Sequence, residues 1–192
     1  MVIGILDVQG AVREHQQHLE GLGVEVVLVK QTSDLDGLDG LILPGGESTA
    51  MRRLIERYAM LEPLRERATS LPMFGTCAGM ILLATIVEAG QSHLNAISMT
   101  VRRNAFGRQI DSFEGLLPVE GIEEPIEAVF IRAPLILSIG EGTRVIAKVE
   151  DQIVAVETPL HLACSFHPEL TEDDRLHRYF LEKINSLQQV HP

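Results

Sequence analysis

Hydrophobic and polar residues follow two different patterns along this chain. In the first half, short and nearly continuous apolar runs are separated by longer stretches with helical spacing. Continuous apolar runs are typical of strands buried on both faces of a parallel sheet. We expect such strands at residues 2–8, 24–29, 41–43 and 73–75, and helices over residues 12–22, from Ser48 onward and over residues 80–87. This alternation predicts a parallel sheet with helices on both sides.

Strand-like runs dominate the second half of the chain, where Gly, Pro and Asp turns separate them. We expect strands at residues 98–103, 112–119, 128–131, 144–149, 153–157 and 160–165. The turn between Val149 and Ile153 predicts a hairpin, and residues 173–187 have the pattern of an amphipathic helix. The fold class is therefore α/β, with a mixed, mostly parallel central sheet flanked by helices. A length of 192 residues fits one domain over residues 1–192.

The charge balance excludes some classes of partner. The chain has 16 Lys and Arg against 27 Asp and Glu, a net charge of −11, which argues against nucleic-acid binding through phosphates. No apolar run approaches the roughly 20 residues that a membrane helix needs, and the apolar N-terminus lacks the basic residues of a secretion signal. With only two cysteines, no disulfide framework is indicated. We expect a cytoplasmic protein with no membrane partner.

The motif Gly75-Thr76-Cys77-Ala78-Gly79 indicates a nucleophile. Small residues two positions before and after Cys77 allow a sharp turn from a strand into a helix, which lifts the side chain above the sheet. The start of the following helix favours the anionic thiolate. A free cysteine is more often a buried structural residue, but this context favours catalysis. Cys164 lacks the context, and we expect it in the core.

His167-Pro168-Glu169 can provide a base and the group that orients it. A cysteine hydrolase needs an imidazole to take and return a proton, and a further side chain to hold the ring. His167 follows a predicted strand, so it would lie at the carboxyl edge of the sheet, where α/β proteins place ligands. Glu169 is two positions further on and can reach the same side. In isolation this short motif is weak evidence for a catalytic pair, because it more often forms a turn that begins a helix.

Pro44-Gly45-Gly46-Glu47-Ser48 forms a glycine-containing loop after a predicted strand. Its backbone can approach a ligand closely and can supply one N–H of an oxyanion hole, with that of Ala78 as the other. The plainer interpretation is a tight turn in which Ser48 or Thr49 caps the next helix. No Gly-Lys-Ser/Thr follows, which excludes a P-loop.

The remaining polar groups give weaker signals. Arg102, Arg103 and Arg108 form a basic island, and Arg132 ends a strand-like run, so an arginine could hold a substrate carboxylate. The other histidines, His15, His18, His93, His161, His177 and His191, lack a catalytic context, and we expect them at the surface or partly packed. No metal-ligand spacing is present, so no metal site is expected.

Together, the glycine loop, the cysteine elbow and the late His-x-Glu resemble the class I glutamine amidotransferases, and more closely the glutaminase subunits of pyridoxal phosphate synthases. The resemblance extends over residues 9–15, 43–49, 74–79, 103–109, 130–134 and 164–170. Asp7 departs from the pattern, since the first strand of this family would end in a small or apolar residue.

The resemblance implies a flavodoxin-like three-layer sandwich and the hydrolysis of L-glutamine to glutamate and ammonia. It implies a Cys-His-Glu triad of Cys77, His167 and Glu169 that works through a thioester. It also implies a hetero-oligomer with a synthase subunit that uses the ammonia to make pyridoxal 5'-phosphate, and it implies no cofactor for this chain. It assigns the glutamine site to Gly46, Glu47, Ser48, Arg103, Ile131 and Arg132, the oxyanion hole to Gly46 and Ala78, and a partner-sensitive loop to Gln9 and Gly10.

Two alternatives stay open at this point. One is a glutaminase that serves another biosynthetic synthase, such as that of imidazole glycerol phosphate or anthranilate. Only residues 103–109 and 130–134 separate this alternative from the resemblance above. The other is a catalytically silent regulatory subunit that only docks, against which the intact Cys77, His167 and Glu169 argue.

Overall fold

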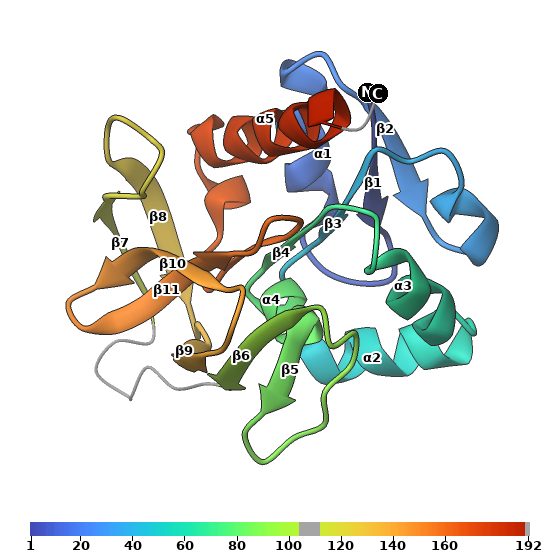
Figure 1. Cartoon of the computed structure of the whole chain (residues 1–192), viewed down its shortest axis with the longest axis horizontal. Coiled ribbons are helices and arrows are strands. Elements are labelled where there is room, and N and C mark those ends of the chain that lie inside the picture. Colours follow the sequence, from blue (N-terminus) through green and yellow to red (C-terminus); the bar gives the residue numbers. More distant parts are fainter. Residues whose placement is uncertain (104–111, 191–192) are drawn as a thin grey trace.

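The computed structural model describes residues 1–103 and 112–190, and within them a ten-stranded mixed sheet forms the centre of the protein (Figure 1). The strands are β1 Val2–Leu6, β2 Glu25–Val29, β3 Gly40–Leu43, β4 Met73–Thr76, β5 Ala84–Val87, β6 Ile97–Arg102, β7 Ser112–Leu117, β8 Ile126–Ile131, β9 Leu135–Ile139, β10 Arg144–Val149, β11 Gln152–Glu157 and β12 Leu162–Cys164. The helices are α1 Val12–Gly21, α2 Ser48–Arg57, α3 Leu61–Arg67, α4 Ala78–Leu83 and α5 Arg175–Val190, with single turns η1 Thr32–Leu35 and η2 Pro168–Leu170.

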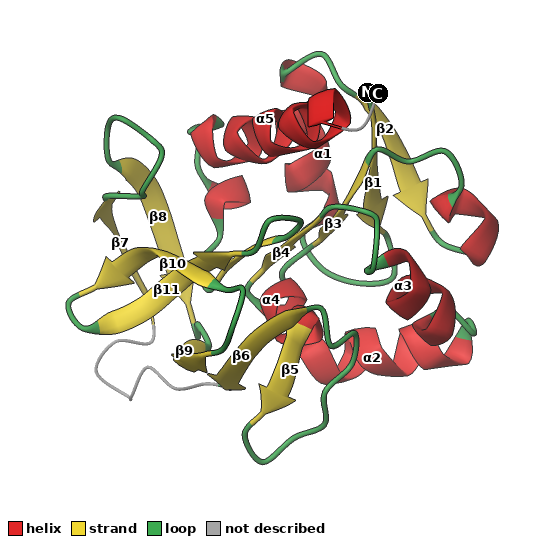
Figure 2. Cartoon of the chain, viewed as in Figure 1, coloured by secondary structure: helices red, strands yellow, loops and turns green. Residues whose placement is uncertain are grey.

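The parallel part of the sheet has the order β2-β1-β3-β4-β12. Successive side chains of a strand point to opposite faces. Ile42 packs on one face with residues of α1 and α5, whereas Leu41 and Leu43 pack on the other with residues of α2, α3 and α4. Figure 2 shows the helices on these two sides of the strands. The predicted parallel sheet with helices on both faces is confirmed.

Beyond β12 the sheet becomes mainly antiparallel. Strand β11 pairs with β12, β10 and β9, all antiparallel, and β6 then joins β9 to the edge strand β5. The predicted hairpin is present between β10 and β11, where Val149 pairs with Gln152. Strands β7 and β8 form a separate two-stranded sheet.

The prediction of one helix over residues 80–87 is wrong. Helix α4 ends at Leu83, and the next four residues form β5, which pairs in parallel with β6. A continuous apolar run is compatible with either structure, and here the unpaired edge of β6 provides hydrogen-bond partners that favour a strand. Helix α3 and strand β9 were not among the predicted elements, and the predicted strand at residues 160–165 is reduced to the three residues of β12.

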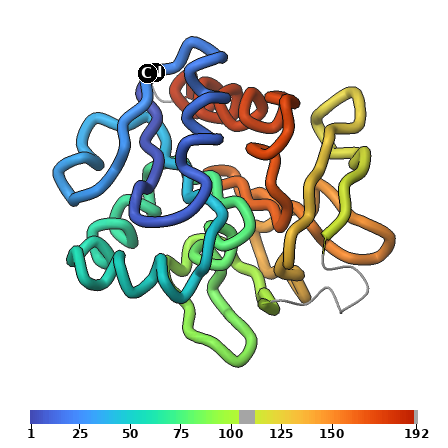
Figure 3. Tube along the Cα trace, turned by 180° about the vertical axis from the view of Figure 1, so that it is seen from behind, coloured from blue at the N-terminus to red at the C-terminus, as the bar shows by residue number. Residues whose placement is uncertain are grey.

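Asp39, just before β3, connects the two ends of the described chain. One oxygen of its carboxylate accepts a hydrogen bond from the backbone of Val2 at 2.7 Å, and the other accepts one from the side chain of Gln188 at 2.8 Å. The start of β1 and the end of α5 therefore meet at the amino ends of β1 and β3. Seen from behind in Figure 3, α1 and α5 lie side by side. Within the described residues, no helix combines the length and apolar character needed to cross a membrane.

Candidate active site

The pairing of β12 with β4 brings together the two halves of the predicted site. The strands run in parallel with Cys164 opposite Thr76, and the N–H of Cys77 donates to the carbonyl of Cys164 at 2.9 Å. Cys77 follows β4 directly, and His167 lies three residues after Cys164. Both therefore leave the sheet at the same edge, which closes a separation of 167 − 77 = 90 residues.

Cys77 occupies a strained turn between β4 and α4. Its φ is 48° and its ψ is −105°, a conformation that residues other than glycine rarely adopt. A Cβ on Gly79 would overlap the carbonyl oxygen of Leu43, and one on Gly75 would crowd the backbone of Gly79. The small residues on either side of Cys77 are therefore needed for the turn itself. Cys164, by contrast, is fully buried, as expected for a core residue.

His167 stands between Cys77 and Glu169. Its Nδ1 lies 2.7 Å from Oε1 of Glu169, so Nε2 remains for the hydrogen bond with the Cys77 side chain. Burial alone lowers the pKa of His167, but the hydrogen bonds and charges of Cys77 and Glu169 outweigh burial and raise it to about 10. The backbone N–H of His167 donates to Val129 of β8 at 2.8 Å, which fixes the residue to the sheet. The arrangement can transfer a proton to and from the sulfur.

The glycine loop after β3 is joined to the loop after β1. The N–H of Ala11 donates to the carbonyl of Gly45 at 2.9 Å, and Oε1 of Gln9 accepts from the N–H of Glu47 at 2.9 Å. Gly10 has a φ of +109°, and a Cβ there would overlap the Gly45 carbonyl, so this contact requires glycine. Asp7, the departure from the family pattern, lies just beyond β1 and pairs with Lys30 at 3.3 Å.

Glu47 is the N-cap of α2, which corrects the prediction that Ser48 or Thr49 has this role. Its carboxylate accepts hydrogen bonds from the N–H groups of Thr49 at 2.9 Å and Ala50 at 2.7 Å. These bonds lower the pKa of Glu47. Nη2 of Arg103 lies 3.6 Å from the same carboxylate, so Glu47 also holds an arginine at the site.

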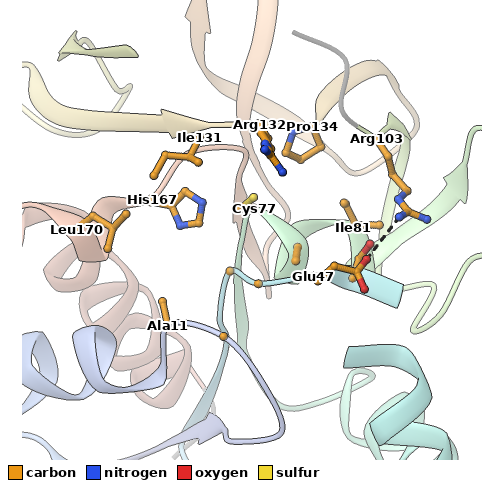
Figure 4. Close-up of a pocket in the computed structure, with 15 residues that line it drawn as sticks. Ala11, Glu47, Cys77, Ile81, Arg103, Ile131, Arg132, Pro134, His167 and Leu170 are labelled. Atoms are coloured by element: carbon orange, nitrogen blue, oxygen red, sulfur yellow. Dashed lines mark ion pairs between the residues drawn. The ribbon is translucent and has the colours of Figure 1, made fainter. Parts of the chain in front are cut away.

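A cavity of about 520 Å³ opens in front of Cys77 (Figure 4). Most of the predicted site residues line it: Gly10, Gly46, Glu47, Ser48, Cys77, Ala78, Arg103, Ile131, Arg132 and His167. Ala11, Gly45, Ile81, Pro134 and Leu170 complete the lining. Gln9 and Glu169 lie behind the cavity wall, where Gln9 binds the backbone of Glu47 and Glu169 binds the ring of His167.

Strand β8 delivers Ile131 and Arg132 to the cavity wall. Arg132 follows the strand with a φ of 45°, and Figure 4 shows its side chain directed toward the space above Cys77. Arg103 reaches the cavity from the end of β6, whereas its neighbour Arg102 pairs with Glu88 outside it. Arg108 and the rest of the stretch 104–109 lie outside the described residues.

Residues 5–186 match the SNO glutamine amidotransferase family. The chain belongs to this family. It is 67% identical over 184 residues, 96% of each chain, to a protein of Exiguobacterium sibiricum named pyridoxal 5'-phosphate synthase subunit PdxT. A protein of the same name from Geobacillus thermodenitrificans is 53% identical over 192 residues, which cover 99% of this chain and 98% of the relative.

One solved structure agrees with membership of the glutamine amidotransferase family, and a second has the same fold. A crystal structure titled as a glutamine amidotransferase has a TM-score of 0.91 and 47% identity, and the match covers 96% of this chain and 100% of that one. A protein of Thermoplasma acidophilum described as a GMP synthase subunit has a TM-score of 0.70 at 21% identity, over 99% of this chain and 96% of that one. The second likeness concerns the fold alone.

In this glutamine amidotransferase, the prediction that the remaining histidines are exposed or partly packed is wrong for most of them. His15 and His177 are fully buried, and His93 and His161 are nearly so. His18 is half-buried, and His191 is outside the described residues. His15 lies behind Glu169 and was missed as a residue of the site, although its position four residues before the buried Leu19 places it on the inner face of α1.

No group of three or more His, Cys, Asp or Glu side chains in residues 1–103 and 112–190 could hold a metal ion. Behind Cys77, Nδ1 of His167 binds Glu169, and the ring nitrogens of His15 lie within hydrogen-bond distance of Thr76 and His177.

Proposed function

We propose that this chain is the glutaminase subunit of a pyridoxal 5'-phosphate synthase, working as one domain over residues 1–192. It hydrolyses L-glutamine to L-glutamate and ammonia and passes the ammonia to a synthase subunit. The observation that carries the chemistry is the alignment of Cys77, His167 and Glu169 at one edge of the sheet, with a 2.7 Å contact between the last two. Membership of the family and the names of the close relatives support the pathway.

The reaction begins with attack of the Cys77 sulfur on the side-chain carboxamide carbon of glutamine. Negative charge develops on the carboxamide oxygen, and the N–H groups of Gly46 and Ala78 would donate hydrogen bonds to it. Removing one preorganised donor of this kind costs roughly 2.7–4 kcal/mol of transition-state stabilisation. His167, protonated and held by Glu169, gives its proton to the nitrogen as the C–N bond breaks, and ammonia leaves. A thioester between Cys77 and the glutamyl group remains.

Water completes the cycle. His167, now neutral, removes a proton from water as the oxygen attacks the thioester carbon, and the C–S bond breaks to release glutamate and the Cys77 thiolate. The proton stays on His167, so the imidazolium and thiolate are restored together. The raised pKa of His167, about 10, agrees with a resting site in which this ring is charged.

Recognition of the amino-acid end of glutamine falls to the outer wall of the cavity. Arg103 and Arg132 bring positive charge there, and a guanidinium can bind a carboxylate through two parallel hydrogen bonds. Glu47, Ser48 and Ile131 line the same wall and complete the proposed glutamine site. The N–H of Glu47 already donates to Gln9, so a change in the loop of Gln9 and Gly10 would reach this wall directly.

The synthase partner follows from the product. Ammonia released into water becomes protonated and loses its nucleophilicity, so it is useful only when handed to an acceptor site in the same complex. We therefore propose a hetero-oligomer with the synthase subunit, in which pyridoxal 5'-phosphate is the partner's product and not a cofactor of this chain. A thiolate nucleophile also suits a reducing compartment such as the cytoplasm.

Glutamate release, measured with and without the synthase subunit, tests the proposal. We expect low activity alone and a rise when the synthase subunit is added. Cys77→Ala should reduce release by roughly 10⁴-fold or more under both conditions, because the nucleophile is absent, while co-purification with the synthase is kept. Cys164→Ala is the matched control, since this cysteine is buried outside the cavity, and it should retain activity.

Two outcomes would contradict the proposal. Activity that survives in Cys77→Ala would refute the nucleophile. Stimulation by the synthase of another pathway, but not by the synthase that makes pyridoxal 5'-phosphate, would refute the pathway while leaving the glutaminase chemistry in place.

A further inference from the structure

A buried chain of polar side chains continues behind Glu169. His15 of α1 and Glu169 are both fully buried, and Nε2 of His15 lies 3.7 Å from Oε2 of the carboxylate. The same Nε2 lies 3.2 Å from the hydroxyl of Thr76, the residue before Cys77. On its other side, Nδ1 of His15 is 2.8 Å from Nε2 of His177 in α5. Helices α1 and α5 thus bring two histidines to the back of the site.

The two oxygens of Glu169 have different surroundings. Oε1 is bound to His167 at 2.7 Å, whereas Oε2 is buried and has no hydrogen-bond partner within the described residues. A buried carboxylate oxygen without a donor is costly, and a free second oxygen would also let the carboxylate rotate away from His167. Nε2 of His15 faces Oε2 at 3.7 Å, just beyond hydrogen-bond distance.

The hydrogen-bond partners select the tautomers of the two histidines. Only one proton fits between Nδ1 of His15 and Nε2 of His177, and Nδ1 of His177 has no partner within the described residues. If His177 donates through Nε2, its Nδ1 carries no proton, and the single proton of His15 is on Nε2, facing Thr76 and Glu169. The opposite choice would bury an N–H of His177 without an acceptor and turn a lone pair of His15 toward the carboxylate. The first arrangement is the less costly one.

Both rings are neutral in this arrangement. Burial, followed by the charges of His177, His18 and His167, lowers the pKa of His15 well below its ordinary value. Burial and the ring of His18, stacked on His177 with centroids 4.5 Å apart, lower the pKa of His177 to about 3. The buried carboxylate of Glu169 therefore has a charged His167 on one side and the neutral ring of His15 on the other, with Nε2 of His15 3.7 Å from Oε2.

We propose that His15 is a positioning residue for the glutaminase reaction, holding Oε2 of Glu169 so that Oε1 stays on His167. The inference rests on the function proposed above. Because Nε2 of His15 also reaches Thr76, the same side chain connects the carboxylate to the strand that ends at Cys77. Helix α1 begins at Val12, two residues after Gly10, so its N-terminal end joins the glycine loop, through Ala11, to Glu169, through His15.

Two polar substitutions separate the contacts of Nε2 of His15, with Glu169 and Thr76, from the contact of its Nδ1 with His177. The amide nitrogen of Gln lies at the distance of Nε2, so His15→Gln still presents an N–H toward Glu169 and Thr76. The shorter Asn reaches only as far as Nδ1, so His15→Asn keeps the contact with His177 and loses those with Glu169 and Thr76. We expect His15→Asn to lower kcat for glutamate release about 10- to 100-fold, with KM for glutamine within about twofold. His15→Gln should retain most of kcat, and His15→Leu should behave like His15→Asn.

A matched control separates positioning from stability. His161 is also buried, with its ring bonded to the backbone of Ala68 and Met73, but it lies away from Cys77. His161→Leu should lower the thermal unfolding midpoint without lowering kcat of the folded protein. If His15→Leu does not fold, the comparison of His15→Asn with His15→Gln still tests the role of His15. Equal kcat in those two variants, or a loss confined to KM, would overturn the proposal.

Failure of this inference is distinguishable from failure of the proposed function. The wild type and Cys77→Ala are measured in the same assay, with the synthase subunit present. An active wild type, an inactive Cys77→Ala and a fully active His15→Asn would refute only the role of His15. An inactive wild type would instead refute the proposed function, and a crystal structure of His15→Asn would then test whether the Glu169 carboxylate turns away from His167.

Discussion

Glu169 sets the charge of the site through a single short contact. Its Oε1 lies 2.7 Å from His167, and the carboxylate, like the ring, is buried. Burial alone would favour a neutral His167, but Cys77 and Glu169 raise its pKa to about 10. Since this value is above the ordinary 6.5, the proton stabilises the folded state fully below pH 6.5, and the contribution is lost as the pH rises toward 10.

Glu169→Gln keeps the size of the side chain and removes its charge. The pKa of His167 should fall, so the free energy of unfolding of the variant should depend less on pH. The difference from the wild type should be largest near pH 6.5 and shrink toward pH 10, which urea unfolding at several pH values measures. Glutamate release should drop roughly 10⁴-fold, as for loss of the third member of other triads.

Glu172→Gln provides the control for this prediction, because Glu172 is exposed in the segment that follows η2. It should leave both the pH dependence and the activity unchanged. A stability difference between Glu169→Gln and the wild type that stays constant from pH 6.5 to 10 would show that the charge of Glu169 does not support His167.

Sequence patterns predict the triad residues of the site but not His15, which lies behind them. Cys77, His167 and Glu169 belong to local motifs whose spacing has a chemical meaning, so the sequence alone is enough to predict them. His15 contacts Glu169 only because α1 packs beside η2, and a single histidine in an amphipathic helix carries no signal of such a contact. Helical spacing places His15 on the inner face of α1 with Leu19, but it does not show which residue of another element His15 contacts.

At the level of elements, the backbone of helix α4 packs directly against the backbone of β3 at Gly79. Gly79 approaches the carbonyl of Leu43 so closely that a Cβ would overlap it. This approach sets the position of α4, and with it the N–H of Ala78 at the start of the helix. The turn at Cys77 depends on the same approach, since it is the link between β4 and α4.

Gly79→Ala should therefore destabilise the protein although alanine is the better helix former. We expect a loss of about 1–3 kcal/mol in the free energy of unfolding, from the shift that the extra methyl group forces on α4 or β3. Urea unfolding measures the loss. Gly21→Ala is the matched control: it is also a helical glycine, but no atom lies within 4 Å of its added Cβ. It should be neutral or up to about 1 kcal/mol more stable, and equal losses in both variants would contradict the packing argument.

Element types were predictable where an apolar run is bounded by turn residues, as for β1, β3 and β4. They were not predictable over residues 80–87, because the same apolar side chains fit a buried helix and a strand, and the deciding factor is pairing with β6. The cap of α2 was missed for a related reason. Serine and threonine are the usual caps, whereas here the longer Glu47 side chain reaches back to Thr49 and Ala50.

At the level of the whole molecule, a nearly buried carboxylate joins the β10–β11 hairpin to the C-terminal helix. Glu157 of β11 accepts hydrogen bonds from Tyr179 at 3.0 Å and Lys183 at 3.2 Å, and it pairs with Arg144 of β10. Burial alone raises the pKa of Glu157, but these three partners outweigh burial and hold it below its ordinary value. Its contribution to stability is therefore present near neutral pH and is lost as the pH falls through the lowered pKa.

Glu157→Gln should lower the free energy of unfolding by about 1–3 kcal/mol at pH 7, because charged partners lose their acceptor. The difference from the wild type should narrow as the pH falls below about 4, near the ordinary pKa of a glutamate. Glu120→Gln is the control, since Glu120 pairs with the same Arg144 at an exposed position and should change stability by no more than about 0.5 kcal/mol. A difference for Glu157→Gln that does not narrow between about pH 4 and about pH 2 would contradict the role of its charge.

The order of the strands is the part of the fold that sequence patterns could not supply. Alternating strands and helices predict parallel pairing among the first strands. They do not indicate that β12, near the end of the chain, lies between β4 and β11. That position puts Cys164 opposite Thr76 and so determines the site. The strand order depends on contacts between segments far apart in the sequence, and local residue spacing does not indicate these contacts.

The carboxylate of Asp39 binds both Val2 and Gln188 at the amino ends of β1 and β3, on the opposite edge of the sheet from Cys77. An affinity tag or surface linker attached at either terminus would therefore project away from the mouth of the cavity. Immobilised molecules would present that mouth to the solution in a common orientation. Capture through a terminus is accordingly the attachment of choice for measuring how fast a synthase subunit binds and leaves, without obstructing the entry of glutamine.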